Sequence, residues 1–227
     1  MLEELLKLED LVNNPTARIP VCLCLDTSGS MDGKPIKELN DGIKLFYEAI
    51  EEDEIAKYSA EVSIVKFGGD AKCIEGFSSL ENRQIGGSLN AIGGTPMGEG
   101  VNIALDLLEE RKKEYSENGV DYYQPWLVLM TDGQPNGLRK ELERAIERVN
   151  KLVDDGKLTV FPIAIGENAD IKVLERFSKN RKPLKLQGLR FKEFFAWLSK
   201  SVSNTSKSMV GDKIKLDIEG LKGWAEL

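Results

Sequence analysis

Three short polar runs carry side-chain oxygens that could bind a divalent cation. They are Asp26-Thr27-Ser28-Gly29-Ser30, Gly93-Gly94-Thr95-Pro96 and Met130-Thr131-Asp132-Gly133. Carboxylate and hydroxyl oxygens are hard ligands, which Mg²⁺ prefers in near-octahedral geometry. The chain contains no histidine, which excludes serine-histidine-aspartate hydrolysis, cysteine-histidine proteolysis and histidine-based zinc sites. The three runs therefore predict a metal site built from oxygen ligands alone.

The candidate metal-binding side chains are Asp26, Ser28, Ser30, Thr95 and Asp132. Ser28 and Ser30 are two residues apart in a predicted extended turn, so both hydroxyls can point inward. Gly93 and Gly94 have no side chain, which lets the loop that carries Thr95 approach closely. Two carboxylates balance the charge of one divalent ion, and hydroxyls are weak donors. Such an ion would keep its attraction for an anionic oxygen from outside.

Each run also has a purely structural interpretation. Residues 26–30 have the composition of an ordinary Asp/Ser/Gly turn. Thr95, which precedes Pro96, could be a helix N-cap, and the Asp132-Gly133 pair could be only a turn. The combination favours the metal site, because the three runs occur in this order and each is predicted at the same edge of one sheet.

Alternating strands and helices must bring the three runs together. Apolar runs bounded by turn residues predict strands at 19–25, 60–67, 72–77, 126–130, 157–165 and 184–186, with the last at an edge of the sheet. Apolar positions three and four residues apart predict helices at 35–54, 97–113, 138–153, 171–178 and 191–202. The pattern is typical of an α/β fold with a doubly wound, mostly parallel sheet, one antiparallel edge strand at 72–77 and helices on both faces. Ligands in such folds bind beyond the carboxyl ends of the strands.

The overall composition limits the classes of binding partner and indicates the cellular compartment. A net charge of −7 over 227 residues disfavours nucleic acid and anionic membranes, which attract basic surfaces. Residues 1–10 are interrupted by charge, unlike a signal peptide, and no apolar run approaches the roughly 20 residues of a spanning helix. Cys22, Cys24 and Cys73 imply no disulfide framework, and Cys22 and Cys24 are interpreted as core residues rather than a metal or redox pair. We therefore expect a cytoplasmic protein.

The order of the site residues resembles the metal-ion-dependent adhesion site of von Willebrand factor A domains. That motif is Asp26-x-Ser28-x-Ser30, then Thr95, then Asp132, and the resemblance covers residues 18–205. It implies that Ser28, Ser30 and Thr95 touch the ion, whereas Asp26 and Asp132 act largely through water. It also implies Mg²⁺, with Mn²⁺ or Ca²⁺ as alternatives, and a protein partner whose aspartate or glutamate completes the coordination. The chain would then be a protein-binding adaptor without catalytic residues, not an enzyme.

Further stretches are similar to the bacterial TerY-like branch of this family, which is associated with tellurium resistance. They are residues 19–31, 129–133, 194–199 and 223–225. The branch implies a cytoplasmic adaptor in a tellurite or stress-response system, alongside a kinase and a phosphatase. The expected organisation is an amphipathic lead at 1–17, a von Willebrand factor A domain at 18–205 and a C-terminal tail at 206–227 that contains Trp224.

Two other classes of function stay open at this point. The chain could be the non-ATPase subunit of an ATP-driven, chelatase-like machine, in which case another chain must supply the ATPase. It could also be a metal-dependent phosphoesterase, which would need a general base near the ion. Asp32 and Glu99 lie nearby in sequence, but we interpret them as a solvated turn residue and a carboxylate in the first turn of a helix.

Overall fold

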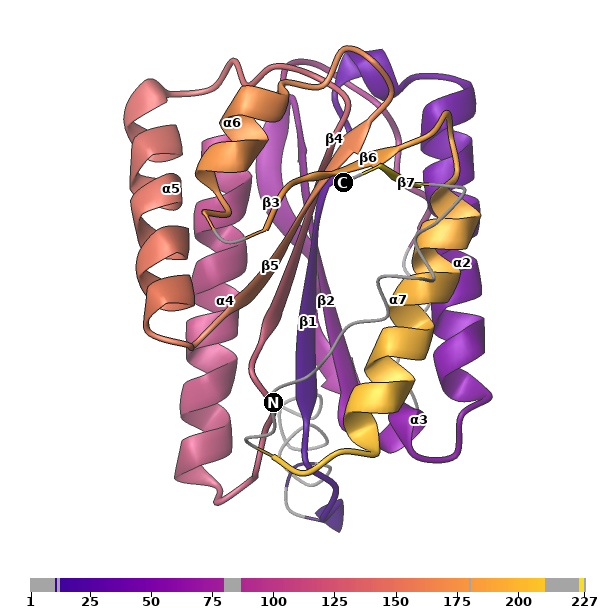
Figure 1. The fold of residues 1–227 in the computed structure, drawn as a ribbon, viewed down its shortest axis with the longest axis vertical. Helices are drawn as coiled ribbons and strands as arrows, with labels where there is room; N and C mark the ends of the chain where they lie inside the picture. Colours follow the sequence, from indigo (N-terminus) through magenta and orange to yellow (C-terminus); the bar gives the residue numbers. More distant parts are fainter. Residues whose placement is uncertain (1–10, 12, 80–86, 180, 211–224, 227) are drawn as a thin grey trace.

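A central β-sheet separates two layers of helices (Figure 1), and the computed structural model describes residues 11, 13–79, 87–179, 181–210 and 225–226. The sheet has the strand order β3-β2-β1-β4-β5-β6-β7. Its strands are β1 (Ile19–Asp26), β2 (Ala60–Gly68), β3 (Asp70–Ser79), β4 (Trp126–Thr131), β5 (Thr159–Ile165), β6 (Leu184–Leu186) and β7 (Ala225–Glu226).

The helices divide between the two faces of this sheet. They are the 3-10 turn η1 (Gly29–Met31) and the helices α2 (Lys34–Glu51), α3 (Ala56–Ser59), α4 (Met97–Glu117), α5 (Arg139–Asp154), α6 (Ile171–Arg176) and α7 (Phe191–Ser206). Helices α2 and α7 cover one face, and α4, α5 and α6 cover the other (Figure 1). None of the helices in the described ranges is long and apolar enough to cross a membrane.

Most neighbouring strands run parallel. β1 pairs in parallel with β2 and β4, and β4, β5 and β6 continue the parallel order. β2 and β3 form an antiparallel hairpin, whose turn uses Gly69 at a φ of 71° that favours glycine. The predicted fold class, a mostly parallel α/β sheet with an antiparallel edge strand, is therefore confirmed.

The apolar sequence of β1 reflects burial on both faces. Val21, Leu23 and Leu25 belong to the core beneath α2 and α7, whereas Cys22 and Cys24 belong to the core beneath α4 and α5. Burial raises the pKa of the Cys22 thiol to about 12, so this thiol stays protonated at neutral pH. The interpretation of the two cysteines as core residues agrees with this environment.

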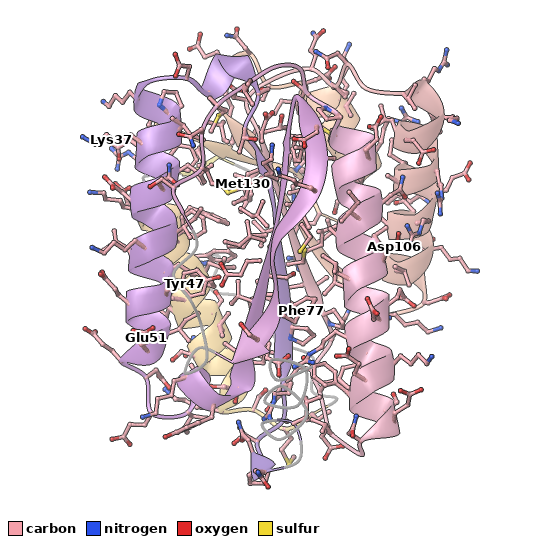
Figure 2. The ribbon with its side chains drawn as sticks, turned by 180° about the vertical axis from the view of Figure 1, so that it is seen from behind. Lys37, Tyr47, Glu51, Phe77, Asp106 and Met130 are labelled. Carbon is pink, nitrogen blue, oxygen red and sulfur yellow. The ribbon has the colours of Figure 1, made fainter. Side chains whose placement is uncertain are left out.

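Close packing fixes α2, the helix that follows the first polar run. Figure 2 shows Tyr47 pointing from α2 toward the sheet, whereas Lys37 and Glu51 lie on its outer side. A Cβ atom at Gly42 would lie 2.6 Å from Cδ2 of Phe195 in α7, so only glycine allows this approach of the two helices. This contact holds α2 and α7 together on one face of the sheet.

The structure differs from the expected elements in a few places. α2 ends at Glu51 rather than at residue 54, because the Asp53 carboxylate accepts hydrogen bonds from the backbone N–H groups of Ile55 and Ala56 and starts α3. β6 has the predicted bounds but is not the last strand, since β7 pairs with it in antiparallel orientation. Most of the expected amphipathic lead at 1–17 and Trp224 of the expected tail lie outside the described residues.

Candidate metal centre

The pairing of β1 with β4 brings the first and third polar runs together. Leu25 pairs with Met130, so Asp26 and Thr131 stand next to each other at the carboxyl ends of two parallel strands. Asp132 follows directly after β4. The predicted meeting of the two aspartates at one edge of the sheet thus follows from the register.

Both carboxylate oxygens of Asp26 accept hydrogen bonds from neutral donors. The backbone N–H of Ser28 donates to Oδ1 at 2.8 Å, and the Thr131 hydroxyl donates to Oδ2 at 2.5 Å. Asp26 and Thr131 are fully buried. These two bonds fix the orientation of the Asp26 carboxylate, and sequence reasoning had not identified Thr131 as a contributor.

A chain of hydroxyl contacts links the first run to Asp132. The Ser30 hydroxyl donates to Asp132 Oδ1 at 2.7 Å, and the hydroxyl oxygens of Ser28 and Ser30 are 3.0 Å apart. Both serine side chains therefore point toward the third run. This agrees with the expectation that residues two positions apart in the turn share one direction.

Thr95 reaches the same place from the start of α4. A Cβ atom added to Gly133 would lie 3.8 Å from Ser30 Oγ and 3.9 Å from Thr95 Oγ1, so both hydroxyls converge on the backbone beside Asp132. Pro96 is the N-cap residue of α4, and the cap has no side-chain hydrogen bond. The interpretation of Thr95 as a helix N-cap is therefore wrong. Its hydroxyl is not used in capping α4 and remains a candidate metal ligand.

Asn136 holds Thr95 in place, which sequence reasoning did not identify. Its Oδ1 accepts a hydrogen bond from the Thr95 N–H at 2.6 Å, and its own N–H donates to the Thr95 carbonyl oxygen at 3.1 Å. A Cβ atom at Gly94 would lie 2.6 Å from Asn136 Oδ1, so a side chain at that position would displace the Asn136 amide from Thr95. The second run is thus held against the loop that follows the third run.

Glycines allow the loops around the site to approach each other. The Gly29 N–H donates to the Gly93 carbonyl oxygen and the Gly69 N–H to the Gly94 carbonyl oxygen, both at 2.9 Å. Gly93 has a φ of 69°, and a Cβ atom there would lie 2.5 Å from Gly69 Cα. The close approach expected from Gly93 and Gly94 is confirmed.

Burial dominates the electrostatics of both aspartates. It raises the pKa of Asp26, and the hydrogen bonds from Ser28 and Thr131 offset only part of this effect. Burial also raises the pKa of Asp132, against the opposing hydrogen bond from Ser30. In the part of the chain that the structure describes, no lysine or arginine contributes to either shift. Within the described residues, the site therefore concentrates negative charge without a lysine or arginine to balance it.

The donor set fits a hard divalent cation. Two carboxylates and three hydroxyls are the oxygen ligands that suit Mg²⁺, Mn²⁺ or Ca²⁺, and no soft sulfur ligand is present. Among the described residues, no group of three or more histidine, cysteine, aspartate or glutamate side chains could hold a metal ion. Binding at this place would therefore depend on the hydroxyls of Ser28, Ser30 and Thr95 together with the two aspartates.

Comparisons with known proteins agree with the fold. The family model described as von Willebrand factor type A domain matches residues 21–193. A protein of Synechocystis sp. described only as uncharacterized is 27% identical over 169 residues, which cover 70% of this chain and 35% of that protein. The chain thus spans about a third of the length of this curated relative.

Solved structures share the fold at low sequence identity. Proximal thread matrix protein 1 from the mussel byssus, described with a zinc-occupied MIDAS motif, has a TM-score of 0.56 and 17% identity, with 83% of this chain and 48% of that chain covered. The TRAP protein of Plasmodium vivax, described as manganese-loaded, has a TM-score of 0.50 and 21% identity, with 72% and 63% covered. At these identities the likeness concerns the fold. Because the family model matches most of its length, the chain belongs to the von Willebrand factor type A domain family.

Proposed function

We propose that this chain binds a protein partner in a divalent-cation-dependent manner, with the ion held by Asp26, Ser28, Ser30, Thr95 and Asp132. The observation that carries the proposal is the convergence of the buried Asp26 carboxylate and the half-buried Asp132 carboxylate with three hydroxyls, without a lysine or arginine of the described chain to balance them. A divalent ion bound there would balance this charge and offer a Lewis-acid position to the carboxylate of an aspartate or glutamate on the partner.

The residues around the five ligands have positioning roles in this proposal. Thr131 and the Ser28 amide hold the Asp26 carboxylate, and Asn136 holds the backbone of Thr95. We favour Mg²⁺ because the oxygen-only set with hydroxyls suits a small hard ion, with Mn²⁺ and Ca²⁺ as alternatives. We propose residues 18–205 as the unit that carries this activity, preceded by the lead at 1–17 and followed by the tail at 206–227.

We further propose that the centre binds its partner without catalysing a reaction on it. The two residues considered as general bases have other surroundings. Glu99 Oε1 accepts a hydrogen bond at 2.9 Å from the Leu138 N–H, and Asp32 is exposed in the turn after η1. Turnover of a generic phosphoester by the wild-type chain that is lost in Asp26→Ala would contradict this part of the proposal.

The biological setting that we propose is a cytoplasmic bacterial tellurite or stress-response system, with a kinase or a phosphatase among the partners. It rests on the resemblance of residues 19–31, 129–133 and 194–199 to the TerY-like branch. Residues 223–225 contribute to the same resemblance, and only Ala225 among them lies within the described ranges. The net charge of −7 supports a protein partner rather than nucleic acid or an anionic membrane.

Affinity capture with matched variants tests the proposed function. The immobilised wild-type chain would be incubated with lysate of the native host in Mg²⁺ or in EDTA, beside Asp26→Ala and Thr95→Val. Thr95→Val keeps the shape of the side chain and removes one candidate ligand. Ser116→Ala is the control, because its hydroxyl donates to the Lys112 carbonyl oxygen on the exposed side of α4, away from the site. Calorimetric titration with Mg²⁺ would accompany each sample.

We expect wild type and Ser116→Ala to bind Mg²⁺ and to retain a common set of proteins in Mg²⁺. EDTA, Asp26→Ala and Thr95→Val should each release that set. Capture of the same proteins under all conditions would contradict a metal-bridged interface, and binding would then have to be sought elsewhere on the chain.

A further inference from the structure

A pocket of about 380 Å³ opens beside the candidate metal centre. Its walls come from the start of α4, the loop at 134–138, α5 and α6. The Asp170 N–H, in its wall, approaches the Gly133 carbonyl oxygen at 3.5 Å, next to Asp132. Glu99, also in its wall, follows Thr95 by one helical turn. The pocket and the metal centre therefore share their loops.

This proximity puts the pocket within reach of a bound partner segment. An extended chain advances about 3.3 to 3.6 Å per residue, and one helical turn rises about 5.4 Å. A partner residue that flanks a carboxylate at the metal centre can thus place its side chain in the pocket. The pocket is a candidate for recognising the residue beside that carboxylate.

One wall of the pocket is apolar and partly open to solvent. Leu138, in the loop before α5, is 58% exposed. Leu142 and Val173 also line the pocket and are only partly buried. An aliphatic group in the pocket would cover these side chains and contribute by removing apolar surface from water.

The charges in the pocket are unevenly balanced. The Glu143 carboxylate forms an ion pair with Arg176, and the positive charge of Arg139 also helps to lower the pKa of Glu143. Glu99 and Asp170 form no ion pair with a lysine or arginine within the described ranges. Two carboxylates therefore face the pocket without a cationic partner in the described structure.

Glu99 is incompletely satisfied within the fold. Its Oε1 accepts the hydrogen bond from the Leu138 N–H, whereas its Oε2 is buried and has no hydrogen-bond partner among the described residues. Asp170 uses Oδ1 to accept from the Val173 N–H at 3.1 Å. A buried carboxylate oxygen without a donor is costly, so a cationic donor that enters the pocket would gain from Glu99.

We propose that this pocket receives a lysine or arginine side chain of the protein partner, beside the aspartate or glutamate that meets the metal centre. The inference rests on the proposed function and adds the chemistry of the neighbouring residue. The aliphatic stem would pack against Leu138, Leu142 and Val173, and the cationic head would approach Glu99 and Asp170. A purely aliphatic side chain would desolvate these carboxylates without compensation, and an acidic one would be repelled by them.

A peptide array tests this inference with a defined probe. Each immobilised peptide would carry one fixed aspartate, with every other residue placed in turn at the flanking positions, and the full chain would be applied in Mg²⁺ or EDTA. Glu99→Gln keeps the acceptor for the Leu138 N–H but loses the charge, and Asp170→Asn keeps the acceptor for Val173. Glu147→Gln, an exposed residue of α5 outside the pocket, is the matched control.

We expect lysine or arginine at one flanking position to raise Mg²⁺-dependent binding about tenfold, the size of one charge-assisted hydrogen bond. Glu99→Gln should remove most of this preference, Asp170→Asn should weaken it, and Glu147→Gln should leave it unchanged. Binding that depends on Mg²⁺ and Asp26 but shows no basic preference, or a preference untouched by Glu99→Gln, overturns this inference alone. An array without Mg²⁺-dependent binding overturns the proposed function and this inference with it.

Discussion

Buried carboxylates lie at both ends of the sheet, and they are balanced in opposite ways. At the amino end, Glu61 of β2 accepts from Arg18 Nε at 3.1 Å and from Arg111 Nε at 2.6 Å. At the carboxyl end, Asp26 and Asp132 accept from hydroxyls and backbone N–H groups of the described residues rather than from a lysine or arginine. One end carries its own cations, whereas the other does not within the described chain.

The amino-end cluster is complete within the protein. The Tyr115 hydroxyl donates to Glu61 Oε2 at 2.6 Å, and Arg111 also contacts Glu114 at 2.6 Å. Burial alone would lower the pKa of Arg111, but the hydrogen bond and the charge of Glu61 raise it above its usual range. Burial and Glu61 likewise raise the pKa of Tyr115 well above its usual value. Every charge in this cluster faces an opposite one.

The comparison separates a structural role from a binding role. A buried carboxylate with two arginines needs nothing more, and its removal harms folding. Asp26 and Asp132 are held by neutral donors, so they keep a negative charge that no lysine or arginine of the described residues balances. This difference is the physical reason for assigning ion binding to Asp26 and Asp132 and only stability to Glu61.

The largest expected effect comes from breaking the amino-end cluster. Glu61→Gln removes the buried negative charge that Arg18 and Arg111 share, so we expect the free energy of unfolding to fall by about 3 to 5 kcal/mol. Urea unfolding followed by tryptophan fluorescence measures this loss. Magnesium binding by the folded fraction should be unaffected, because the cluster lies at the other end of the strands.

Glu114→Gln provides the internal comparison for this measurement. Glu114 contacts the same Arg111, but its side chain is 42% exposed, so its removal should cost less than about 1 kcal/mol. Similar losses for the two variants would show that burial between two arginines does not distinguish Glu61, and the contrast between the two ends would fail.

The second expected effect has the opposite pattern. Asp132→Asn can still accept the hydrogen bond from Ser30 but carries no charge. We expect affinity for Mg²⁺ to fall about 10- to 100-fold, as for other groups that support a metal site. Folding stability in EDTA should be equal to or slightly above that of the wild type, because burial disfavours the charged form of Asp132. A loss of stability in EDTA like that of Glu61→Gln would contradict our assignment.

The pH dependence sharpens the same contrast. Burial raises the pKa of Asp26 and Asp132 above about 3.9, the value of an aspartate in an unfolded chain. The folded state therefore holds these protons to higher pH. The stability that this pair contributes in EDTA falls as pH rises from the unfolded pKa through the raised folded pKa values. Protons compete with Mg²⁺ for the same carboxylates. Stabilisation by Mg²⁺ should thus be present at neutral pH and disappear as pH falls through the raised pKa values.

Unfolding temperatures measured across the acidic range, with Mg²⁺ and with EDTA, would test this expectation. The two curves should separate at neutral pH and merge at low pH. Curves that stay parallel at all pH values would mean that the ion does not bind to titrating carboxylates.

The candidate site was largely predictable from the sequence, and the amino-end cluster was not. Asp26 and Asp132 end or follow apolar strands, so parallel pairing alone brings them to one edge. Glu61 is separated from Arg18 by 43 residues and from Arg111 by 50, and a single charged residue in a strand is usually a solvent-facing one. Only the three-dimensional pairing reveals that it is buried.

Side chains that hold the site were also hidden in the sequence. Asn136 lies in a loop whose composition indicates only a turn, and its contact with Thr95 depends on how two loops meet. Thr131 belongs to the third polar run, but the sequence does not indicate that its hydroxyl donates to Asp26 across two neighbouring strands. β7 is only two residues long, which is too short for a periodic pattern.

The smallest expected effect concerns Asp53, a carboxylate that has one lysine partner and is less buried than Glu61. Asp53 is 19% exposed and accepts from Lys207 Nζ at 2.8 Å, from Ser203, and from the N–H groups of Ile55 and Ala56. Burial alone would raise its pKa, but these donors lower it well below the usual range.

Because the folded pKa of Asp53 is depressed, its stabilising contribution is complete above about 3.9, the unfolded value, and is lost as pH falls toward the folded pKa. Asp53→Ala should cost about 1 kcal/mol at neutral pH, the size of a lost helix-start hydrogen bond with a half-exposed ion pair. The cost should shrink in strong acid, because wild-type Asp53 then loses its charge. The effect of Asp132→Asn in EDTA should also shrink in acid, but there protonation removes a destabilising charge from the wild type. A cost for Asp53→Ala that is independent of pH would show that packing against α7, rather than charge, gives this residue its role. Pairing with a lysine or arginine of the same chain would then indicate a structural role only for the buried Glu61 cluster.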